Sequence, residues 1–450
     1  MMTSRRIEWR GELFASDLRH LLERLAGADV ISYDLPHTLT IFLQHEGTPV
    51  RIDQTLRLRS YGDLAELTPA ALLGMLTDGL AAKLQLKAAS GDTAELTNGR
   101  IVVFPVGAEP GADDSWELWL GARRYAPTSV RVARRTHHIL PAKPGSNPVR
   151  VTVDHERHLF RMVTGLMRPL GQMGPRVEVK ADSASEIEAT LATLNPNGLL
   201  KRLPYGSLEL LFQDLLRDTV VPGTCQESPE IEAKFDICGR NPATVGPAVI
   251  DWLSAREGTR LLLPFPHQIV RMRRYHVCAG ADDAAEHSVV ETTAGLLSAK
   301  VKRNAMLRDG VLLRRTVASR TTDIDGACEP IELFLARRGW RRLSTFTKVQ
   351  TKIPFALPNG NAYLVSIDNC VDACGKRLNQ LELEYIGYLG APAAPQDICA
   401  EVALLASQLA AQPLGQSLQP TAQSKHAFFL PPDYRLSGSA AGCRSSSNTA

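Results

Sequence analysis

The sequence predicts a β-rich α+β protein with two tandem antiparallel β-barrel domains, flanking helices and a disordered C-terminal tail. Segments in which charged and apolar residues alternate recur along the 450-residue chain, as expected of strands whose two faces differ. A Pro- and Gly-containing stretch at 220–229 interrupts them, and a similar succession of strands resumes beyond it. Because a chain of this length exceeds one ordinary core, we expect domains at 1–220 and 228–412, followed by a flexible tail at 413–450.

The composition narrows the classes of function. The net charge is only +3, so no overall basic field points to nucleic acid. The sequence contains no run of about 18 apolar residues and no apolar N-terminal segment, so we expect neither a membrane span nor a secretory leader. The eight cysteines include no C-x2-C pair, which favours reduced thiols in a cytoplasmic protein. We therefore expect a cytoplasmic protein with no nucleic-acid and no membrane partner, and its oligomeric state stays open.

The first half is predicted to contain one N-terminal helix followed mainly by strands. Leucines at helical spacing predict the helix over 17–27, with Ser16 as its cap. Residues 50–59 alternate, and their charged face includes Arg57 and Arg59. Further strands are predicted at 100–105, 116–120, 129–134, 149–154 and 176–181, before a capped helix at 185–194.

The second half repeats this organisation of strands with a few helices. The predicted strands are 230–237, 269–277, 296–302, 311–317, 345–355, 362–368 and 378–386. Helices are predicted at 245–257 and 329–338.

The segment EIEAK places the carboxylates of Glu230 and Glu232 and the ammonium of Lys234 on one face of a predicted strand. Near the end of the same half, Glu382 and Glu384 repeat the pattern on another strand. A face so charged is buried only if a counter-charge or an ion lies against it. These four acidic groups, with lysines and arginines between them, therefore suggest a barrel interior that holds a divalent metal and a polyanion.

The second half resembles the CYTH family, the triphosphate tunnel metalloenzymes, over most of residues 230–387. Beside EIEAK, the resemblance rests on LLSAKVKR, VLLRRT, a strand with two lysines, VSIDNC and LELEYIG, in this order. It implies an eight-stranded antiparallel tunnel that binds Mg2+ or Mn2+ and a triphosphate. The implied catalytic residues are Glu230, Glu232 and Lys234. The implied metal ligands are Glu230, Glu232, Asp368, Glu382 and Glu384, and the implied phosphate-binding residues are Lys300, Lys302, Arg314, Lys348 and Lys352.

The first half resembles the VTC polyphosphate polymerase domain, a branch of the same superfamily. The resemblance rests on LRLRSYGD, WELWL, VRVARR, VRVTVDHERHLFR and RVEVKAD, with a weaker contribution from LKRLPYG. The opening strand at 8–14 lacks the lysine that the family carries there. The resemblance implies a second tunnel in which Glu178 is a metal ligand and in which the phosphate-binding residues are Arg57, Arg59, Arg131, Arg150 and Lys180.

These features predict a metal-dependent hydrolase of inorganic triphosphate or of a triphosphorylated organic compound. A polyphosphate polymerase or nucleotidyl cyclase on the same scaffold is an alternative, which the first half favours slightly. A non-catalytic polyphosphate or nucleotide receptor is another, favoured by Ser366, where the family carries an acid. A purely structural role is the third, since EIEAK alone also suits a solvent-exposed edge strand. The pairs His137–His138 and His155–His158 are interpreted as incidental surface histidines.

Overall fold

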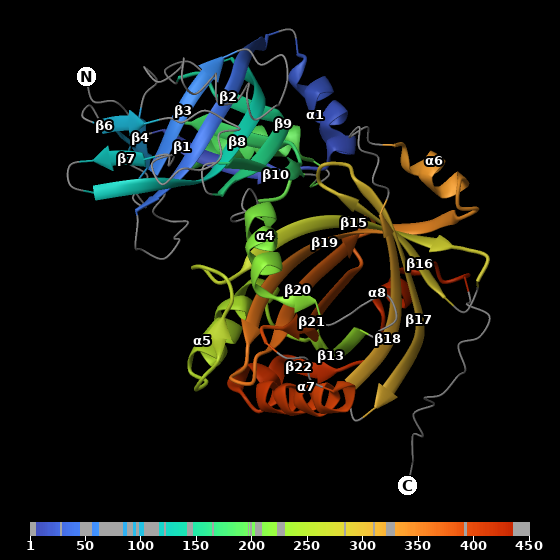
Figure 1. Cartoon of the computed structure of the whole chain (residues 1–450). Helices are drawn as coiled ribbons and strands as arrows, with labels where there is room; N and C mark the ends of the chain where they lie inside the picture. Colours follow the sequence, from blue (N-terminus) through green and yellow to red (C-terminus); the bar gives the residue numbers. More distant parts are fainter. Residues whose placement is uncertain are drawn as a thin grey trace. The chain divides into compact units, whose positions relative to one another are not determined.

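The computed structural model describes residues 6–27, 29–45, 56–62, 84–87, 93–95, 99–102, 117–120, 123–141, 147–163, 166–196, 198, 200–202, 209–222, 230–282, 285–308, 311–320, 329–390 and 394–434 (Figure 1). The chain divides into two compact units. The first unit is 1–219 with 261–271 and 293–295, and the second is 220–260, 272–292 and 296–450. Both are built on antiparallel sheets with few helices, which confirms the predicted β-rich α+β class.

The first unit contains most of the long strands of the N-terminal half. Its elements are β1 (Ile7–Glu12), η1 (Ala15–Asp17), α1 (Leu18–Leu25), β2 (Ile31–His45), β3 (Leu56–Gly62), β4 (Leu84–Lys87), β5 (Thr93–Glu95), β6 (Gly99–Val102), β7 (Glu117–Leu120), β8 (Arg123–Ile139), β9 (Arg150–Val163), β10 (Leu166–Met173), β11 (Arg176–Ala181), α3 (Ala184–Leu194) and α4 (Glu209–Thr219). The strands form one sheet in the order β1-β11-β9-β8-β2-β3-β4-β5, with β10 on β9 and β7 on β8.

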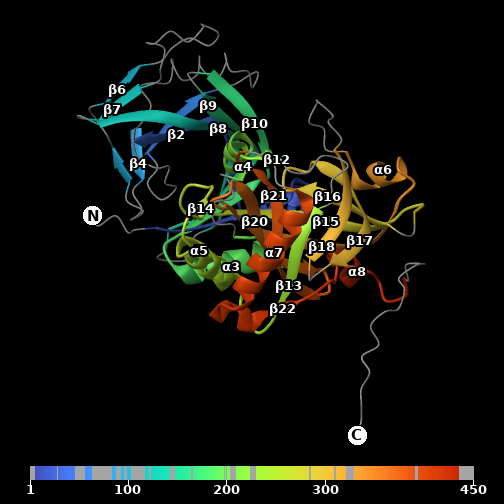
Figure 2. The ribbon, with the colours of Figure 1, turned by 60° about the horizontal axis from the view of Figure 1, so that its bottom comes forward.

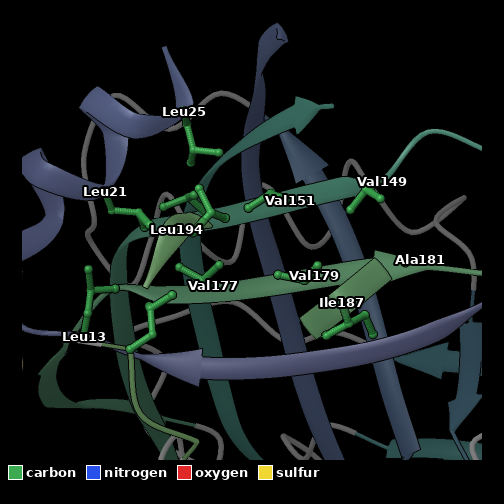
Figure 3. Close-up of a cluster of buried hydrophobic side chains, with 12 residues drawn as sticks. Leu13, Leu21, Leu25, Val149, Val151, Val177, Val179, Ala181, Ile187 and Leu194 are labelled. Carbon is green, nitrogen blue, oxygen red and sulfur yellow. The ribbon is translucent and has the colours of Figure 1, made fainter. Parts of the chain in front are cut away.

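One face of this sheet carries the apolar core of the first unit. Val151 and Val153 of β9 and Val177 and Val179 of β11 are fully buried against leucines from α1 and α3 (Figure 3). Helix α3 begins at a capping box, in which Ser183 and Glu186 each satisfy a backbone N–H of the other. Since side chains alternate along a strand, the intervening residues point to the opposite face, and these are mostly charged.

The second unit is formed by the C-terminal half. Its elements are β12 (Val221–Pro222), β13 (Glu230–Ile237), η4 (Pro242–Thr244), α5 (Val245–Ser254), β14 (Arg260–Leu261), β15 (Ile269–Ala279), β16 (Glu286–Thr292), β17 (Leu297–Arg308), β18 (Val311–Arg320), α6 (Ile331–Ala336), β19 (Arg341–Ala356), β20 (Asn361–Asp372), β21 (Arg377–Tyr388), α7 (Pro395–Ala410), η5 (Pro413–Ser417), β22 (Leu418–Pro420) and α8 (Lys425–Phe429), although the first residues of β15 and the end of β14 cluster with the first unit.

The sheet of the second unit curls back on itself. Its strand order is β12-β21-β20-β19-β15-β16-β17-β18-β13-β22, and β13 pairs with β21 as well as with β18. The pairings from β13 through β18, β17, β16, β15, β19, β20 and β21 therefore return to β13. Among the described strands of the first unit, no such closing pairing occurs, and two tandem barrels stay a prediction.

The C-terminal segment differs from its prediction as a flexible tail beginning at 413. Residues 413–434 contain η5, β22 and α8, and β22 adds to the edge of β13. Phe429 of α8 is buried and stacks on Phe346 of β19, with ring centroids 4.3 Å apart. This aromatic contact fixes the position of the short helix. The local composition of the segment, rich in Ser, Gln and Pro, gives no sign of the contact. Among the described residues, no helix has both the length and the apolar composition needed to cross a membrane.

Candidate functional site

Strand β13 presents a buried charged face. Glu232 and Lys234 alternate along it with Ile231, Ala233 and Phe235, and all five side chains are buried. Because neighbouring side chains of a strand point to opposite faces, the charged residues share one face and the apolar residues the other. Helix α7 packs against β13 and β21 (Figure 2), and we assign the apolar face to that side.

The pairing of β13 with β21 brings the two acidic segments together. Glu384 is the register partner of Glu232, and Glu382 is the register partner of Lys234. Directly opposite residues on antiparallel strands have Cβ atoms about 5 Å apart on the same face. The Lys234 Nζ atom lies 3.2 Å from Glu232 Oε1 and 3.0 Å from Glu382 Oε1. Lys234 therefore bridges the two acidic strands, and its predicted catalytic role stays a prediction.

Asp368 of β20 extends this ion network and is completely buried. Its Oδ2 atom lies 3.3 Å from Lys348 Nζ and 2.8 Å from Lys425 Nζ. Lys425 also lies 2.6 Å from Glu382 Oε1. Burial alone would raise the pKa of Asp368, but Lys348 and Lys425 outweigh it and lower the pKa below its usual value. The carboxylates of Asp368 and Glu382 are thus both held in the charged form.

Lys425 is the site residue that sequence reasoning missed. It stands at the start of α8, inside the segment predicted as a tail. Burial would lower its pKa, but Asp368 and Glu382 raise it well above the usual value of a lysine. A single lysine in a segment of Ser, Gln and Pro carries no periodic signal, so only the tertiary contacts of α8 identify it.

Glu230 connects the network to β17. Its carboxylate lies 2.9 Å from Lys302 Nζ and 3.9 Å from Lys300 Nζ. These two ammonium groups outweigh burial and lower the pKa of Glu230. Burial and the neighbouring Lys302 lower the pKa of Lys300, because two ammonium groups repel each other. Arg314 is the register partner of Glu230 on β18, but its side chain lies outside the described residues.

Glu384 is the one carboxyl of the site whose pKa is raised, to about 7. Burial is the largest cause, followed by the charges of Glu230 and Glu232, while Lys352 of β19 acts in the opposite direction. Glu232 is 1% exposed, and its Oε1 atom has no hydrogen bond despite the nearby Lys234. Three carboxyl groups thus share one low-dielectric region, where like charges cannot all ionise without added positive charge.

The raised pKa of Glu384 beside two other carboxyls is the observation against which a divalent ion can be tested. Mg2+ and Mn2+ prefer carboxylate oxygens, and an ion beside Glu230, Glu232 and Glu384 would relieve their repulsion. The donor chemistry therefore fits such an ion. In the described part of the chain, no three His, Cys, Asp or Glu side chains are already gathered as metal ligands. A divalent cofactor, with Glu382 and Asp368 as further ligands, stays a prediction.

Glu178, Lys180 and Arg150 are the predicted first-unit residues on β11 and β9, the strands that carry the charged face of that sheet. Glu178 of β11 lies 3.0 Å from Lys180 Nζ and accepts a 3.0 Å hydrogen bond from Arg10 Nε. Lys180 and Arg10 outweigh burial and hold the pKa of Glu178 well below its usual range. Arg150 of β9 is the register partner of Lys180. Glu178 is therefore paired with cations of the chain, and a metal-binding role for it stays a prediction.

Three further predictions concern arginines of the first unit. Arg131 is buried on β8, with its guanidinium 5.5 Å from the centre of the Phe42 ring. Arg57 and Arg59 lie on β3, but their side chains are outside the described residues.

The prediction that the histidine pairs are surface residues is wrong for two of them. His137 and His138 are buried, and their Nδ1 atoms lie 2.8 Å from Thr152 Oγ1 and Ser32 Oγ. His137 and His138 are successive residues of β8, a strand paired by β2 and β9, so they point to opposite faces of the sheet and both faces are covered here.

Comparisons with known proteins add no functional evidence. No family model matches the chain, and no curated protein matches it. Among solved structures, the chain aligns with the di-domain ARO/CYC StfQ from the steffimycin biosynthetic pathway. The sequence identity is 10%, over 90% of this chain and 93% of that chain, and the TM-score is 0.12. This TM-score is too low to support a conclusion about fold or function.

Proposed function

We propose that the second unit is a metal-dependent phosphohydrolase that acts on inorganic triphosphate or a triphosphorylated organic compound. In this proposal the curled sheet is a triphosphate tunnel, and the first unit is a second, VTC-like tunnel. The observation that carries the proposal is the buried charged face shared by β13, β20 and β21. It combines carboxylates that crowd one another with ammonium groups from several strands. Such a mixture suits a polyanion accompanied by a divalent cation.

The lysines of the site account for binding of the phosphate chain. Lys300 and Lys302 of β17 face Glu230, and Lys348 of β19 lies 4.9 Å from the centre of the Tyr275 ring. Phosphoryl transfer depends mainly on positioning and on neutralising charge, and ammonium groups on neighbouring strands supply both. The lowered pKa of Lys300 is expected to return toward the usual lysine value when phosphate oxygens bind beside it.

Glu384 would respond to the bound ion. Its pKa of about 7 leaves the carboxyl partly protonated near neutral pH, and a divalent ion beside it would displace that proton. When bound, a divalent ion would neutralise charge on the phosphate oxygens and on Glu230 and Glu232. Lys234 holds Glu232 and Glu382 in place by contacting both.

A non-catalytic polyphosphate receptor is the second candidate function. Lys425 is paired with both Asp368 and Glu382, so two of the predicted metal ligands already have a counter-charge from the chain itself. Carboxylates that are neutralised in this way compete poorly for a metal ion. This function predicts tight binding of tripolyphosphate without turnover.

The decisive experiment measures phosphate release from tripolyphosphate with added Mg2+ or Mn2+. We expect the wild-type chain to be active and the double variant Glu230→Gln, Glu232→Gln to lose activity by at least a hundredfold, as for removal of other electrostatic catalytic groups. Asp251→Asn, at an exposed position of α5, is the matched control and should keep full activity. An equally active double variant would refute the assignment. Binding without any phosphate release would establish the receptor instead.

A second assay separates the enzymes that share the scaffold. The chain is incubated with ATP and Mn2+, and the products are resolved for cyclic nucleotide, long-chain polyphosphate and free phosphate. Hydrolysis predicts free phosphate alone. Accumulation of polyphosphate or of a cyclic nucleotide would replace the hydrolase proposal with the corresponding alternative.

A further inference from the structure

One lysine of the candidate site comes from outside the curled part of the sheet. Lys234 belongs to β13 and Lys348 to β19, so both stay in the site as long as these strands are paired. Lys425 belongs to α8, which follows the last strand, and its Nζ atom lies 2.8 Å from Asp368 Oδ2 and 2.6 Å from Glu382 Oε1. Of these three lysines, Lys425 alone can withdraw while the strand pairings are kept.

The segment 421–429, which we name the C-terminal strap, carries this lysine into the site. The carbonyl of Gln423 in the strap accepts a 3.1 Å hydrogen bond from Gln380 Nε2 of β21. At the other end of the strap, helix α8 lies against β16 and β19 (Figure 1), where Phe429 stacks on Phe346. A helix of five residues is not stable by itself, so the position of α8 depends on these contacts and on the ion pairs of its lysine.

Two oxygen atoms at the strap are buried and have no hydrogen-bond partner in the described part of the chain. They are Asp368 Oδ1 and Gln380 Oε1, on residues that are 0% exposed and are register partners on β20 and β21. Glu382 lies on the same face of β21 as Gln380, because the two are two residues apart. Unpaired buried acceptors are costly, and side-chain oxygens are the ligands that Mg2+ and Mn2+ prefer. This end of the site therefore suits a divalent ion once the ammonium has left.

Lys425 and a divalent ion exclude each other at this end of the site. Burial alone would lower the pKa of Lys425, but Asp368 and Glu382 raise it well above the usual value, so the side chain stays an ammonium. Mg2+ binds its oxygen ligands at about 2.1 Å. An ammonium that lies 2.8 Å and 2.6 Å from oxygens of the same two carboxylates takes up that space, and two cations repel each other there. The ion therefore binds here only by replacing the ammonium.

We propose that the C-terminal strap is an autoinhibitory element, in which Lys425 occupies the Asp368–Glu382 end of the site and a divalent ion binds there after the strap has withdrawn. The inference rests on the proposed function, because it concerns the metal ion of that proposal, and it adds a regulation of the same site. Binding of the ion and docking of the strap are coupled equilibria. A more weakly docked strap therefore tightens ion binding, and the ion loosens the strap by the same factor.

The test measures Mn2+ binding to the full-length chain by calorimetry, without substrate. Lys425→Met removes the competing ammonium and should bind Mn2+ roughly tenfold more tightly than the wild type, or better. Phe429→Leu changes no charge but removes the stack on Phe346, so Mn2+ should bind about twofold to tenfold more tightly. Arg377→Met, at an exposed position of β21, is the matched control for the loss of a positive charge and should bind as the wild type does.

Hydrogen exchange of the strap is the second measurement on the same samples. The backbone N–H groups of Ala427 and Phe428 each donate a 3.0 Å hydrogen bond to Ser424, so their exchange reports whether α8 is formed. Saturating Mn2+ should speed this exchange in the wild type, while the amides of α7 stay as protected as before. In Phe429→Leu the exchange of α8 should be faster even without Mn2+.

The proposal is overturned if Phe429→Leu binds Mn2+ as the wild type does and exchange of the strap does not respond to the ion. Lys425 would then act only as a local charge, even if Lys425→Met binds more tightly. Absence of Mn2+ binding in every chain would overturn this proposal and the metal-dependent hydrolase together. A strap that Mn2+ loosens, without phosphate release from tripolyphosphate, would refute the hydrolase alone. Should Lys425→Met fail to fold, Phe429→Leu and the exchange measurement decide the outcome.

Discussion

The raised pKa of Glu384 makes a prediction about stability that can be tested without any substrate. Its pKa is raised from 4.5 to about 7, first by burial and then by Glu230 and Glu232. The folded state therefore keeps the proton up to about pH 7, whereas the unfolded chain releases it near pH 4.5. Stability is fully present below pH 4.5 and is lost as the pH rises through 7. A difference of 7 − 4.5 = 2.5 pH units, at about 1.4 kcal/mol per unit, corresponds to about 3 kcal/mol.

The substitution Glu384→Gln removes the titrating group and keeps its size. We expect the variant to match the wild type near pH 4.5 and to exceed it at pH 8 by up to about 3 kcal/mol in free energy of unfolding. Urea unfolding at four or five pH values measures both curves. Glu382→Gln is the matched control, because it lies on the same strand but contacts Lys234 and Lys425. That variant leaves Lys234 and Lys425 with one carboxylate partner each, Glu232 and Asp368, and should be less stable than the wild type at pH 8, not more.

The same reasoning predicts how divalent cations change the stability of the wild type. If an ion neutralises the three crowded carboxyls, Mg2+ or Mn2+ should restore the stability of the wild type at pH 8 and release a proton on binding. Glu384→Gln should gain much less. If Glu384→Gln is less stable than the wild type at pH 8, the raised pKa of Glu384 is not explained by crowded carboxylates. This result would also remove the main reason for placing a metal ion there.

Three further predictions concern single residues. Lys425→Met leaves Asp368 and Glu382 with fewer counter-charges and should cost about 3 kcal/mol in urea unfolding; an unchanged midpoint would show that α8 does not hold the site. The pKa of His137 is lowered to about 4 by burial, Arg150 and Arg135. The free energy of unfolding should therefore fall by at most about 3 kcal/mol as the pH drops from 6.5 to 4, and His137→Asn should reduce this loss. Ser183→Ala should lower stability by about 1 kcal/mol, measured by thermal melting, because it removes the cap of α3.

Much of the second-unit site could be predicted because strand alternation is a local property. Two carboxylates two residues apart share a face wherever an extended strand forms, so EIEAK and LELEY were sufficient to predict charged faces on β13 and β21. Their juxtaposition could not be worked out from alternation alone, since pairing depends on the whole sheet. The register of Glu232 with Glu384 is therefore information that the structure adds.

Lys425 shows what local patterns cannot reveal. A helix of five residues is too short for a periodic signal, and α8 packs through the stacking of Phe429 on Phe346. The place of Lys425 beside Asp368 and Glu382 therefore arises from contacts between residues far apart in the sequence.

Glu384 in the second unit and Asp154 in the first are buried carboxyl groups with different neighbours, and their pKa values shift in opposite directions. This difference is the basis for assigning the proposed chemistry to one unit. In the second unit the cations are mostly ammonium groups, and the pKa of Glu384 is still raised, first by burial and then by the neighbouring Glu230 and Glu232. In the first unit guanidinium groups hold Asp154, whose pKa is lowered by Arg176 and Arg135 against the effect of burial. A guanidinium binds a carboxylate through two hydrogen bonds and stays charged, so that acid is closed to a metal ion. The metal-dependent chemistry that we propose is therefore assigned to the second unit, where Glu230, Glu232 and Glu384 crowd one another.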